Sequence, residues 1–211
     1  MDERDIIARR IAQEIPPGSL VNLGRGIPQL VSKYAKDIVL YGENGTIGYG
    51  FGDYIDVDLI DGGCNFAAPI AGMSFVDSAT SFAIARGGHL DFTVMGALQV
   101  SENGDLANWT RSLQEVGGIG GGMDMAVGAR NVIIAIKHVT SEGRPKIVKR
   151  CSMPLTGIRC VNLIVTDVAV IEVTNRGLVL REILNGMKFD DVQRITEPTL
   201  IDQTRAGTFT P

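Results

Sequence analysis

The segment Tyr41-Gly42-Glu43-Asn44-Gly45 contains the strongest candidate for a reactive side chain in this sequence. It follows the apolar run Ile38-Val39-Leu40, which predicts that a buried strand ends just before a loop bracketed by glycines. Open α/β sheets place their chemistry at strand ends of this kind, so the Glu43 carboxylate is expected at the rim of such a sheet. The alternative is a solvated glutamate in a turn, but other segments point to the reactive interpretation.

Two further segments could complete a site around this carboxylate. The glycine-rich run from Gly117 to Gly122 places consecutive backbone N–H groups just before a predicted helix. Such a run can form an anion or oxyanion cradle, although tight packing of a helix on a strand would also require glycines. A second polar run extends from Gln99 to Trp109 and includes Asn108. A carboxylate opposite an amide cradle suits acyl transfer, because the amides stabilise the charge of the transition state.

The sequence lacks the motifs of several other kinds of functional site. Gly24-Arg25-Gly26 has the first two glycines of a dinucleotide-binding fingerprint, but Gln29 replaces the third glycine and Pro28 removes a donor. The sequence contains no phosphate-binding P-loop and no Gly-x-Ser-x-Gly nucleophile elbow. Its two histidines, His89 and His138, are too far apart to form a helical metal pair, and the cysteines lack Cys-x-x-Cys spacing. We therefore expect no metal site.

Length and composition limit the class of protein. A chain of 211 residues with 45% hydrophobic content is expected to form one well-buried domain spanning residues 1–211. Its net charge of −4, with charges mixed along the chain, argues against a nucleic-acid-binding surface. The charged first fifteen residues lack the continuous apolar stretch of a signal peptide or membrane anchor, and three widely spaced cysteines fit a reducing compartment. We expect a cytoplasmic protein that binds neither nucleic acid nor membrane.

The elements that must position these residues follow from apolar periodicity and from helix and turn signals. Helices are expected at 3–15, 27–36, 77–86, 124–129 and 190–196, with Gly87 closing the third. Strands are expected at 20–23, 38 to about 43, 57–60, 90–95, 132–136, 161–165, 169–173 and 178–180. Asn175-Arg176-Gly177 supplies a hairpin turn between the last two. This order predicts an α/β fold with an open, mainly parallel sheet flanked by helices and an added antiparallel portion near the C-terminus.

Eight short segments together resemble one known family, in the same order along nearly the whole chain. The family is the B (β) subunit of the 3-oxoacid CoA-transferases, and the segments are Val21-Asn22-Leu23-Gly24, Glu43-Asn44-Gly45, Asp58-Leu59-Ile60, Ser81-Phe82-Ala83, Arg86-Gly87-Gly88-His89, Gly104-Asp105-Leu106-Ala107-Asn108-Trp109, Gly120-Gly121-Gly122-Met123-Asp124 and Pro154-Leu155-Thr156-Gly157. The resemblance implies the CoA-transferase fold, which is shared with ribose-5-phosphate isomerase. It also implies a ping-pong exchange of CoA between an acyl-CoA and a free carboxylic acid.

The resemblance assigns roles to several residues. Glu43 matches the family's nucleophile, which carries CoA as a glutamyl thioester, and covalent catalysis of this kind divides the transfer into two easier steps. Gly121, beside Gly120, matches the oxyanion glycine, and Asn108 matches an asparagine that lines the site. Asn44 and Gly45 become candidates for contacts with substrate or CoA. No permanently bound cofactor or metal is implied, because CoA is itself the substrate and part of the covalent intermediate.

The sequence also departs from the family pattern. Cys64 stands where members commonly carry a lysine near the CoA moiety, and Ser112-Leu113-Gln114 replaces a Pro-Gly-Lys segment. Arg25 stands where an apolar residue is usual. Arg25 or Arg111 could pair with a substrate carboxylate, although a solvated or interface arginine is the alternative at each position. These changes lie near the expected acyl pocket, so the resemblance does not identify the donor and acceptor acids.

The resemblance implies an obligate A subunit as partner, in an αβ or α2β2 assembly. Two alternatives keep the same scaffold: a CoA-transferase for another acid, such as butyrate, acetate, 3-oxoadipate or glutaconate, and an acyl-CoA hydrolase in which water reaches the Glu43 thioester. A third is a non-enzymatic metabolite-sensing module. It lacks an attached DNA-binding helix pair or basic stretch and would not need an intact Glu-Asn-Gly segment.

Overall fold

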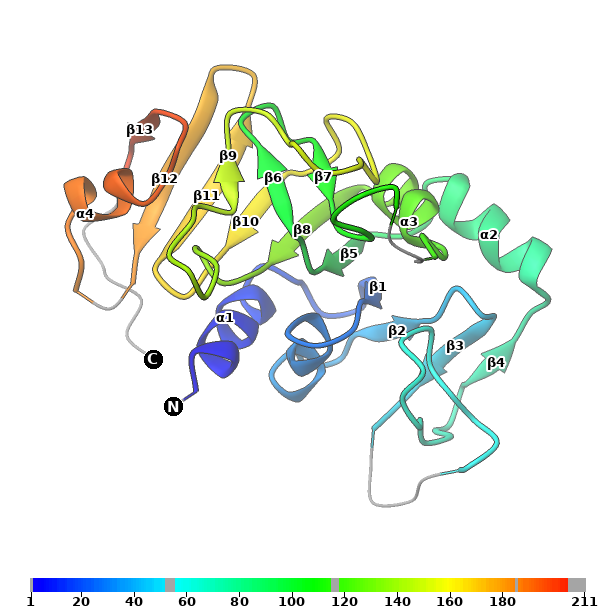
Figure 1. Ribbon diagram of the computed structural model, residues 1–211. Coiled ribbons are helices and arrows are strands. Elements are labelled where there is room, and N and C mark those ends of the chain that lie inside the picture. Colours follow the sequence, from blue (N-terminus) through cyan, green and yellow to red (C-terminus); the bar gives the residue numbers. More distant parts are fainter. Residues whose placement is uncertain (1, 52–55, 115–117, 185, 205–211) are drawn as a thin grey trace.

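The computed structural model describes residues 2–51, 56–114, 118–184 and 186–204. These residues form a large mixed sheet that runs across the molecule from β13 to β4, with a small three-stranded sheet beside it (Figure 1). Their helices are α1 (Glu3–Ala12), the 3-10 helix η1 (Pro28–Lys33), α2 (Ser78–Arg86), α3 (Gly122–Gly128) and α4 (Phe189–Arg194).

The large sheet has the order β13 (Leu200–Asp202), β12 (Gly177–Ile183), β11 (Ala169–Thr174), β10 (Leu163–Val165), β8 (Asn131–Ala135), β5 (Phe92–Met95), β1 (Leu20–Leu23), β2 (Val39–Tyr41), β3 (Thr46–Tyr49) and β4 (Ser74–Phe75). The small sheet has the order β7 (Leu106–Ala107), β6 (Gln99–Ser101) and β9 (Ile147–Val148). Strands β2, β1, β5, β8 and β10 are parallel, so their carboxyl ends meet at one edge.

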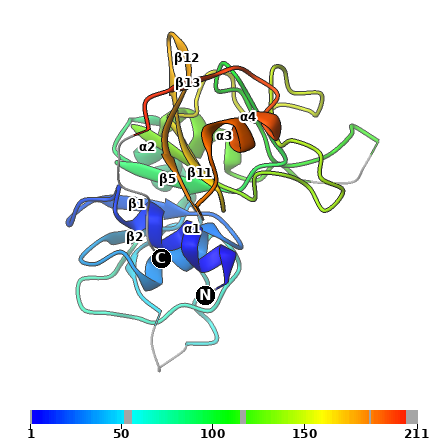
Figure 2. The ribbon, with the colours of Figure 1, turned by 90° about the vertical axis from the view of Figure 1, so that its left-hand side faces the viewer.

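Successive side chains of the central strands point to opposite faces of the large sheet, so a hydrophobic core forms on each face. Val21 and Leu23 of β1 pack into the cluster that holds α1 and η1. Ile133 of β8 faces the same cluster, whereas its neighbour Ile134 faces the small sheet and α3. Figure 2 shows α2 and α3 above β5 and α1 below it. Both faces are therefore covered, as expected for a parallel sheet.

Most predicted elements are confirmed, with small shifts of their ends. Strand β1 has the predicted bounds, the two-residue turn between β11 and β12 is present, and the C-terminal strands β11 and β12 are antiparallel. Helix α2 ends before Gly87 as predicted, but Gly88 is the residue with the left-handed backbone, at φ +71°. The α/β class and the mainly parallel sheet are confirmed.

Two predictions of local structure are wrong. Residues 57–60 form a turn and an isolated bridge, because the Asp56 carboxylate accepts the backbone N–H of Asp58 at 3.0 Å and closes a local turn. Residues 27–36 form the short helix η1 in place of an α-helix. Within it the Ser32 hydroxyl donates to the Gln29 carbonyl at 2.8 Å, an i to i−3 contact that fits the tighter helix.

The structure adds elements that the sequence did not indicate. Strand β3 pairs antiparallel with β2, and β4 pairs antiparallel with β3, so antiparallel pairs lie on both sides of the parallel centre of the sheet. The three strands of the small sheet and β13 were likewise not predicted, because runs of two or three residues carry too little periodicity. No helix in the described part of the chain is long and apolar enough to cross a membrane. The cytoplasmic location stays a prediction.

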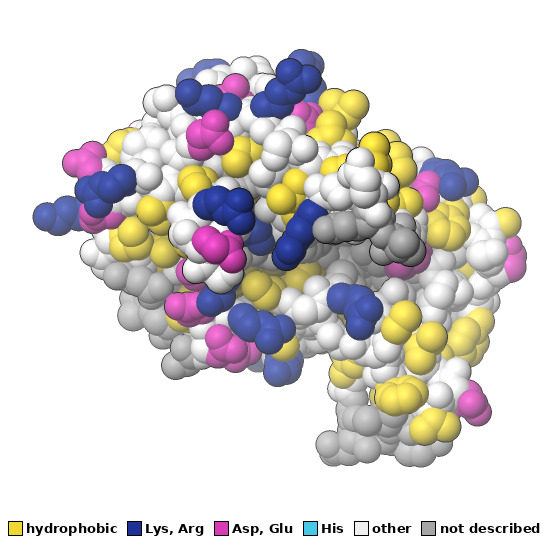
Figure 3. Space-filling model, in the orientation of Figure 1, with side chains coloured by type: hydrophobic (Ala, Val, Ile, Leu, Met, Phe, Trp, Pro, Cys, Tyr) yellow, Lys and Arg dark blue, Asp and Glu magenta, His cyan; other side chains and the backbone are white. Residues whose placement is uncertain are grey.

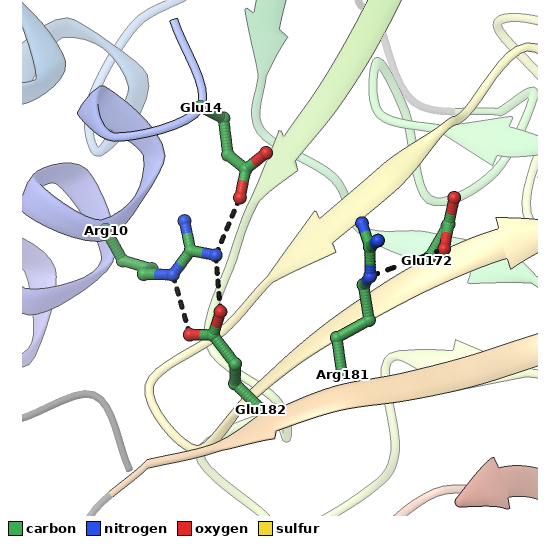
Figure 4. A network of polar contacts seen from close by, with 5 residues as sticks. All are labelled: Arg10, Glu14, Glu172, Arg181 and Glu182. Atoms are coloured by element: carbon green, nitrogen blue, oxygen red, sulfur yellow. Dashed lines mark hydrogen bonds and ion pairs between the residues drawn. The ribbon is translucent and has the colours of Figure 1, made fainter. Parts of the chain in front are cut away.

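A buried arginine connects α1 to the C-terminal half of the sheet. Both Nε and Nη2 of Arg10 donate to the Glu182 carboxylate at 2.7 Å, and Nη2 also donates to Glu14 at 2.6 Å (Figure 4). The Arg10 side chain is only 7% exposed. The neighbouring Arg181–Glu172 pair in the same view is longer, at 3.4 Å, and its side chains are 41% and 39% exposed. The two pairs should therefore differ in their effect on stability.

We expect Arg10→Ala to lower the free energy of unfolding by about 2–4 kcal/mol, because it leaves two partly buried carboxylates without their partner. Arg181→Ala is the matched control and should cost less than about 1 kcal/mol, since its ion pair is exposed. Urea denaturation of the purified protein followed by circular dichroism measures both values. Equal losses of unfolding free energy in the two variants would contradict the larger contribution expected from the buried Arg10.

His138 is buried at the point where the loop after β8 meets the residue following α4. One ring nitrogen lies 3.0 Å from the Thr166 hydroxyl and the other lies 2.8 Å from the Thr196 hydroxyl. Burial lowers the pKa of His138 to about 4, and the charge of Asp167 raises it only in part. The folded protein therefore holds this imidazole neutral at pH 7.

This burial predicts that stability falls as the pH drops. The unfolded chain binds a proton at His138 below a pKa of about 6.5, whereas the folded chain does so only below about 4. Stability from this group is complete above pH 6.5 and declines by about 3 kcal/mol as the pH falls to about 4. Denaturation midpoints across this range should decline less steeply for His138→Gln. A decline for His138→Gln as steep as that of the wild type would contradict this role of the buried imidazole.

Candidate active site

Glu43 lies in the turn of a hairpin between β2 and β3, at the carboxyl edge of the parallel strands. The Gly42 N–H donates to the Thr46 carbonyl at 2.8 Å, and the Gly45 N–H donates to the Gly42 carbonyl at 2.9 Å. Gly45 has φ +104°, and a Cβ there would meet the Val76 carbonyl oxygen. The turn therefore requires glycine at position 45, which gives Gly45 a backbone role.

The Glu43 side chain is half-buried between two glycines from distant segments. A Cβ on Gly62 would collide with the Glu43 carboxylate, and a Cβ on Gly121 would lie 2.9 Å from the Glu43 Cγ. Phe82 of α2 would also lie 3.3 Å from that Gly121 Cβ. The absence of side chains at these two glycines leaves the space that Glu43 occupies.

Asn22 of β1 holds the carboxylate from the other side. Its Nδ2 donates to Glu43 Oε2 and to the Tyr41 carbonyl, each at 3.2 Å, and its Oδ1 accepts the Thr93 hydroxyl at 3.0 Å. Parallel pairing places Asn22 opposite Tyr41 of β2 and Thr93 of β5. The buried amide is therefore bonded at both ends, and its orientation toward Glu43 is determined by the sheet.

The Glu43 carboxylate opens into a cavity of about 170 Å³. Its described walls are Asn22, Leu23, Gly24, Arg25, Glu43, Gly62, Gly63, Met95, Ile119, Gly120, Gly121, Gly122 and Met125. The predicted Glu43, Gly120, Gly121 and Arg25 are thus brought together. Gly117, the start of the predicted glycine cradle, lies outside the described residues.

Three of the predicted contact residues, Gly45, Asn44 and Asn108, are not among the described residues that line this cavity. Asn44 is exposed, and its Nδ2 donates to the Ile60 carbonyl at 2.8 Å, which ties the hairpin turn to the loop around Gly62. Asn108 donates from Nδ2 to the Gly96 carbonyl at 3.2 Å and accepts the Thr156 hydroxyl at 2.6 Å. Asn108 lies behind the glycine segment, since a Cβ on Gly122 would be 4.0 Å from its Oδ1.

The loop that carries Gly62 is organised by a buried carboxylate. Asp61 accepts the Asn65 backbone N–H at 2.8 Å, and the Asn65 amide also donates to it at 3.0 Å. Cys64 is exposed with φ +61° and is not among the described residues that line the cavity. No group of three or more His, Cys, Asp or Glu side chains in the described ranges could hold a metal ion.

Sequence reasoning missed Asn22 and Thr93 as site residues. Asn22 interrupts the apolar run of β1, and Thr93 interrupts that of β5. A polar side chain inside a short apolar strand is a usable signal, because a buried amide is stable only when its hydrogen bonds are satisfied. What the sequence lacked was the pairing of β1 with β5, which makes the two residues neighbours.

Comparison with known proteins gives consistent matches over most of the chain. The family model for coenzyme A transferase matches residues 4–194. The chain is 44% identical to the B subunit of 3-oxoadipate CoA-transferase from Acinetobacter baylyi, with 96% of each chain covered. It is 41% identical to the B subunit of succinyl-CoA:3-ketoacid coenzyme A transferase from Helicobacter pylori, covering 92% of this chain and 96% of that protein.

Solved structures show the same fold. An acyl-CoA transferase of Escherichia coli O157:H7 aligns with a TM-score of 0.76 and 20% identity, covering 96% of this chain. This chain spans 42% of the length of that protein. Glutaconate coenzyme A-transferase from Acidaminococcus fermentans aligns with a TM-score of 0.71 and 17% identity, covering 95% of this chain and 86% of that one.

We expect Thr93→Val to destabilise the protein by about 1–3 kcal/mol, because it keeps the shape of the side chain but leaves the buried Asn22 Oδ1 without a donor. Thr199→Val is the matched control, since Thr199 is exposed, and it should change stability by less than about 0.5 kcal/mol. Chemical denaturation measures both. A neutral effect of Thr93→Val would show that Thr93 does not orient Asn22.

Proposed function

The chain belongs to the coenzyme A transferase family, and from this premise we propose that Glu43 is the group that carries CoA between an acyl-CoA and a free carboxylic acid. The observation that supports this role most directly is the position of its carboxylate, which opens into a cavity between Gly62 and Gly121. The acids are expected to be of the 3-oxoacid type, as the sequence resemblance implies.

The proposed reaction proceeds through four acyl transfers. The Glu43 carboxylate attacks the thioester carbonyl of the acyl-CoA, giving a mixed anhydride and the CoA thiolate. The thiolate then attacks the glutamyl carbonyl, which gives the Glu43–CoA thioester and releases the donor acid as a carboxylate. The acceptor carboxylate repeats these two steps in reverse order and leaves as the new acyl-CoA. A thioester is exchanged for a thioester, so no external energy source is needed.

Each neighbour of Glu43 has a role in this scheme. Asn22 positions the carboxylate and donates to the oxygen that does not attack. The backbone amides at Gly120 and Gly121 are proposed to stabilise the oxyanion, each contributing about 3–4 kcal/mol if placed as a typical oxyanion donor. Asn44 and Asn108 support the loop and the glycine segment that form the cavity walls.

We propose that an A subunit completes the site, in an αβ or α2β2 assembly. The relatives named above are B subunits of two-part enzymes by name. Large apolar side chains are exposed on the surface, among them Val127 at 72% on α3 and Leu113 at 76%. A second group, Val57, Phe66 and Phe75, is exposed on the segment from the Gly62 loop to β4. Surfaces of this kind are typical of protein interfaces.

The alternatives predict different products. A hydrolase would release free CoA from the Glu43 thioester without an acceptor acid. A transferase for another short-chain acid, such as acetate or butyrate, would show exchange with a different acceptor, and the relatives include the beta subunit of an acetate CoA-transferase from Escherichia coli, 42% identical over 93% of each chain. A metabolite-sensing module would bind a ligand without forming a covalent adduct.

The central experiment uses this chain purified with its A subunit. After treatment with an acyl-CoA in the absence of acceptor, borohydride reduction and peptide mass mapping should place the modification on the peptide that contains Glu43. Glu43→Ala should lower acid-dependent CoA exchange by roughly a thousandfold or more, because the nucleophile is lost while the fold is retained. Glutamine is a weaker choice, since slow deamidation restores the carboxylate.

Glu197→Ala is the matched control, because Glu197 is exposed and does not line the cavity. It should retain full exchange. Undiminished turnover of the Glu43→Ala complex, with normal circular dichroism and assembly, would refute the proposed nucleophile. Free CoA released from the wild-type complex at a rate independent of added acid would favour the hydrolase.

A further inference from the structure

Arg25 lies on the wall between two cavities. It follows β1 directly, lines the Glu43 cavity, and also lines a second cavity of about 590 Å³ that we call the basic groove. The stem of Arg25 packs against the Gly62 loop, since a Cβ on Gly63 would be 3.1 Å from the Arg25 Cγ. Its guanidinium is exposed. Arg25 is therefore placed to contact a substrate that extends from Glu43 into the groove.

The basic groove has a strong excess of positive charge. Its described basic residues are Arg4, Arg25, Arg111, Lys137, Arg144 and Lys146, whereas Glu142 is its single acidic residue in the described part of the chain. Figure 3 shows several Lys and Arg side chains around a hollow near the middle of this face. A surface of this composition attracts anions.

The basic residues of the groove differ in whether a described acidic residue pairs with them. Lys137 pairs with Glu3 and Arg144 pairs with Glu142. The side chain of Arg25 makes no hydrogen bond or ion pair with the residues that the structure describes, whereas the charge of Asp167 acts on the half-buried Lys146 ammonium. A cation left without a partner beside a reactive carboxylate fits a ligand that supplies its own negative charge.

The sizes of the two cavities indicate which part of a substrate each could hold. The Glu43 cavity, at about 170 Å³, is smaller than the usual range of roughly 300–1,000 Å³ for ligand pockets. It has room for the reacting carboxyl end of a small acid. A remaining chain would pass Arg25, whose planar fork binds a carboxylate through two parallel hydrogen bonds.

We propose that Arg25 selects dicarboxylic acids, by binding the far carboxylate at the mouth of the basic groove while the near carboxylate reacts at Glu43. This inference deepens the proposed function and rests on it. An apolar residue at position 25 would accept monocarboxylic acids equally well. Arg25 is thus a specificity-determining residue, and the covalent chemistry does not depend on it.

The test compares acids of equal carbon number with the purified complex of this chain and its A subunit. Acetyl-CoA is the donor, and the acceptors are succinate against butyrate and glutarate against valerate. The wild type should prefer each dicarboxylate. Arg25→Leu should lower the ratio of kcat/KM for succinate to that for butyrate on the order of ten- to a hundredfold, mainly through KM for succinate.

Two further variants sharpen this measurement. Arg25→Lys should retain part of the preference, because it keeps the charge but loses the bidentate geometry. Arg176→Leu is the matched control, since Arg176 lies on the turn between β11 and β12 and lines neither cavity, and it should leave the ratio unchanged. The rate at which each acid discharges the preformed Glu43–CoA thioester gives the same comparison in a single turnover.

The outcomes separate the two proposals. Equal kcat/KM for succinate and butyrate in the wild type, or an unchanged ratio in Arg25→Leu, would overturn the role of Arg25 and leave Glu43 catalysis intact. If Arg25→Leu raises KM for acetyl-CoA equally with both acids, Arg25 would be assigned to the phosphates of CoA. That result would also overturn its role in selecting dicarboxylic acids. Failure of the wild type to form any Glu43 adduct would overturn the proposed function itself.

Discussion

The site depends on the parallel pairing of β1 with β2 on one side and with β5 on the other. This pairing brings the carboxyl ends of three strands to one edge and places Asn22 opposite both Tyr41 and Thr93. Since Val21 and Leu23 face the core under α1, Asn22 must face the opposite side, where Glu43 lies. A buried amide is stable only with its hydrogen bonds made, so the sheet and the carboxylate support one another.

The second constraint is that the two glycines beside Glu43 have no side chains. Gly62 and Gly121 come from separate loops, yet each leaves the volume that part of Glu43 occupies. The Glu43 carboxylate is oriented by the neutral Asn22 amide and makes no ion pair with any residue that the structure describes. A carboxylate that is oriented but not ion-paired is suited to the proposed attack on a carbonyl, whereas a direct ion pair would weaken it as a nucleophile.

The prediction from sequence was correct where a pattern is local. The helix that begins at Glu3, strand β1, the turn after β11 and the α/β class could be read from periodicity and turn residues, and so could the position of Glu43 at the end of a strand. It failed at residues 57–60, where Asp56 closes a turn, and at 27–36, where Ser32 favours the tighter helix. Both failures come from side chains that bond to nearby backbone and so compete with the regular element.

Sequence alone therefore determined the candidate for the reactive residue, the glycine segments and the family, because each is carried by residues adjacent in the chain. Only the tertiary structure decided what surrounds Glu43. Asn22 and Thr93 are 71 positions apart and meet through strand pairing, and Asn108, which looked like a site residue, has its amide bonded behind the glycine segment. Distance in sequence says nothing about such contacts, because parallel strands separated by crossover connections become neighbours only when the sheet forms.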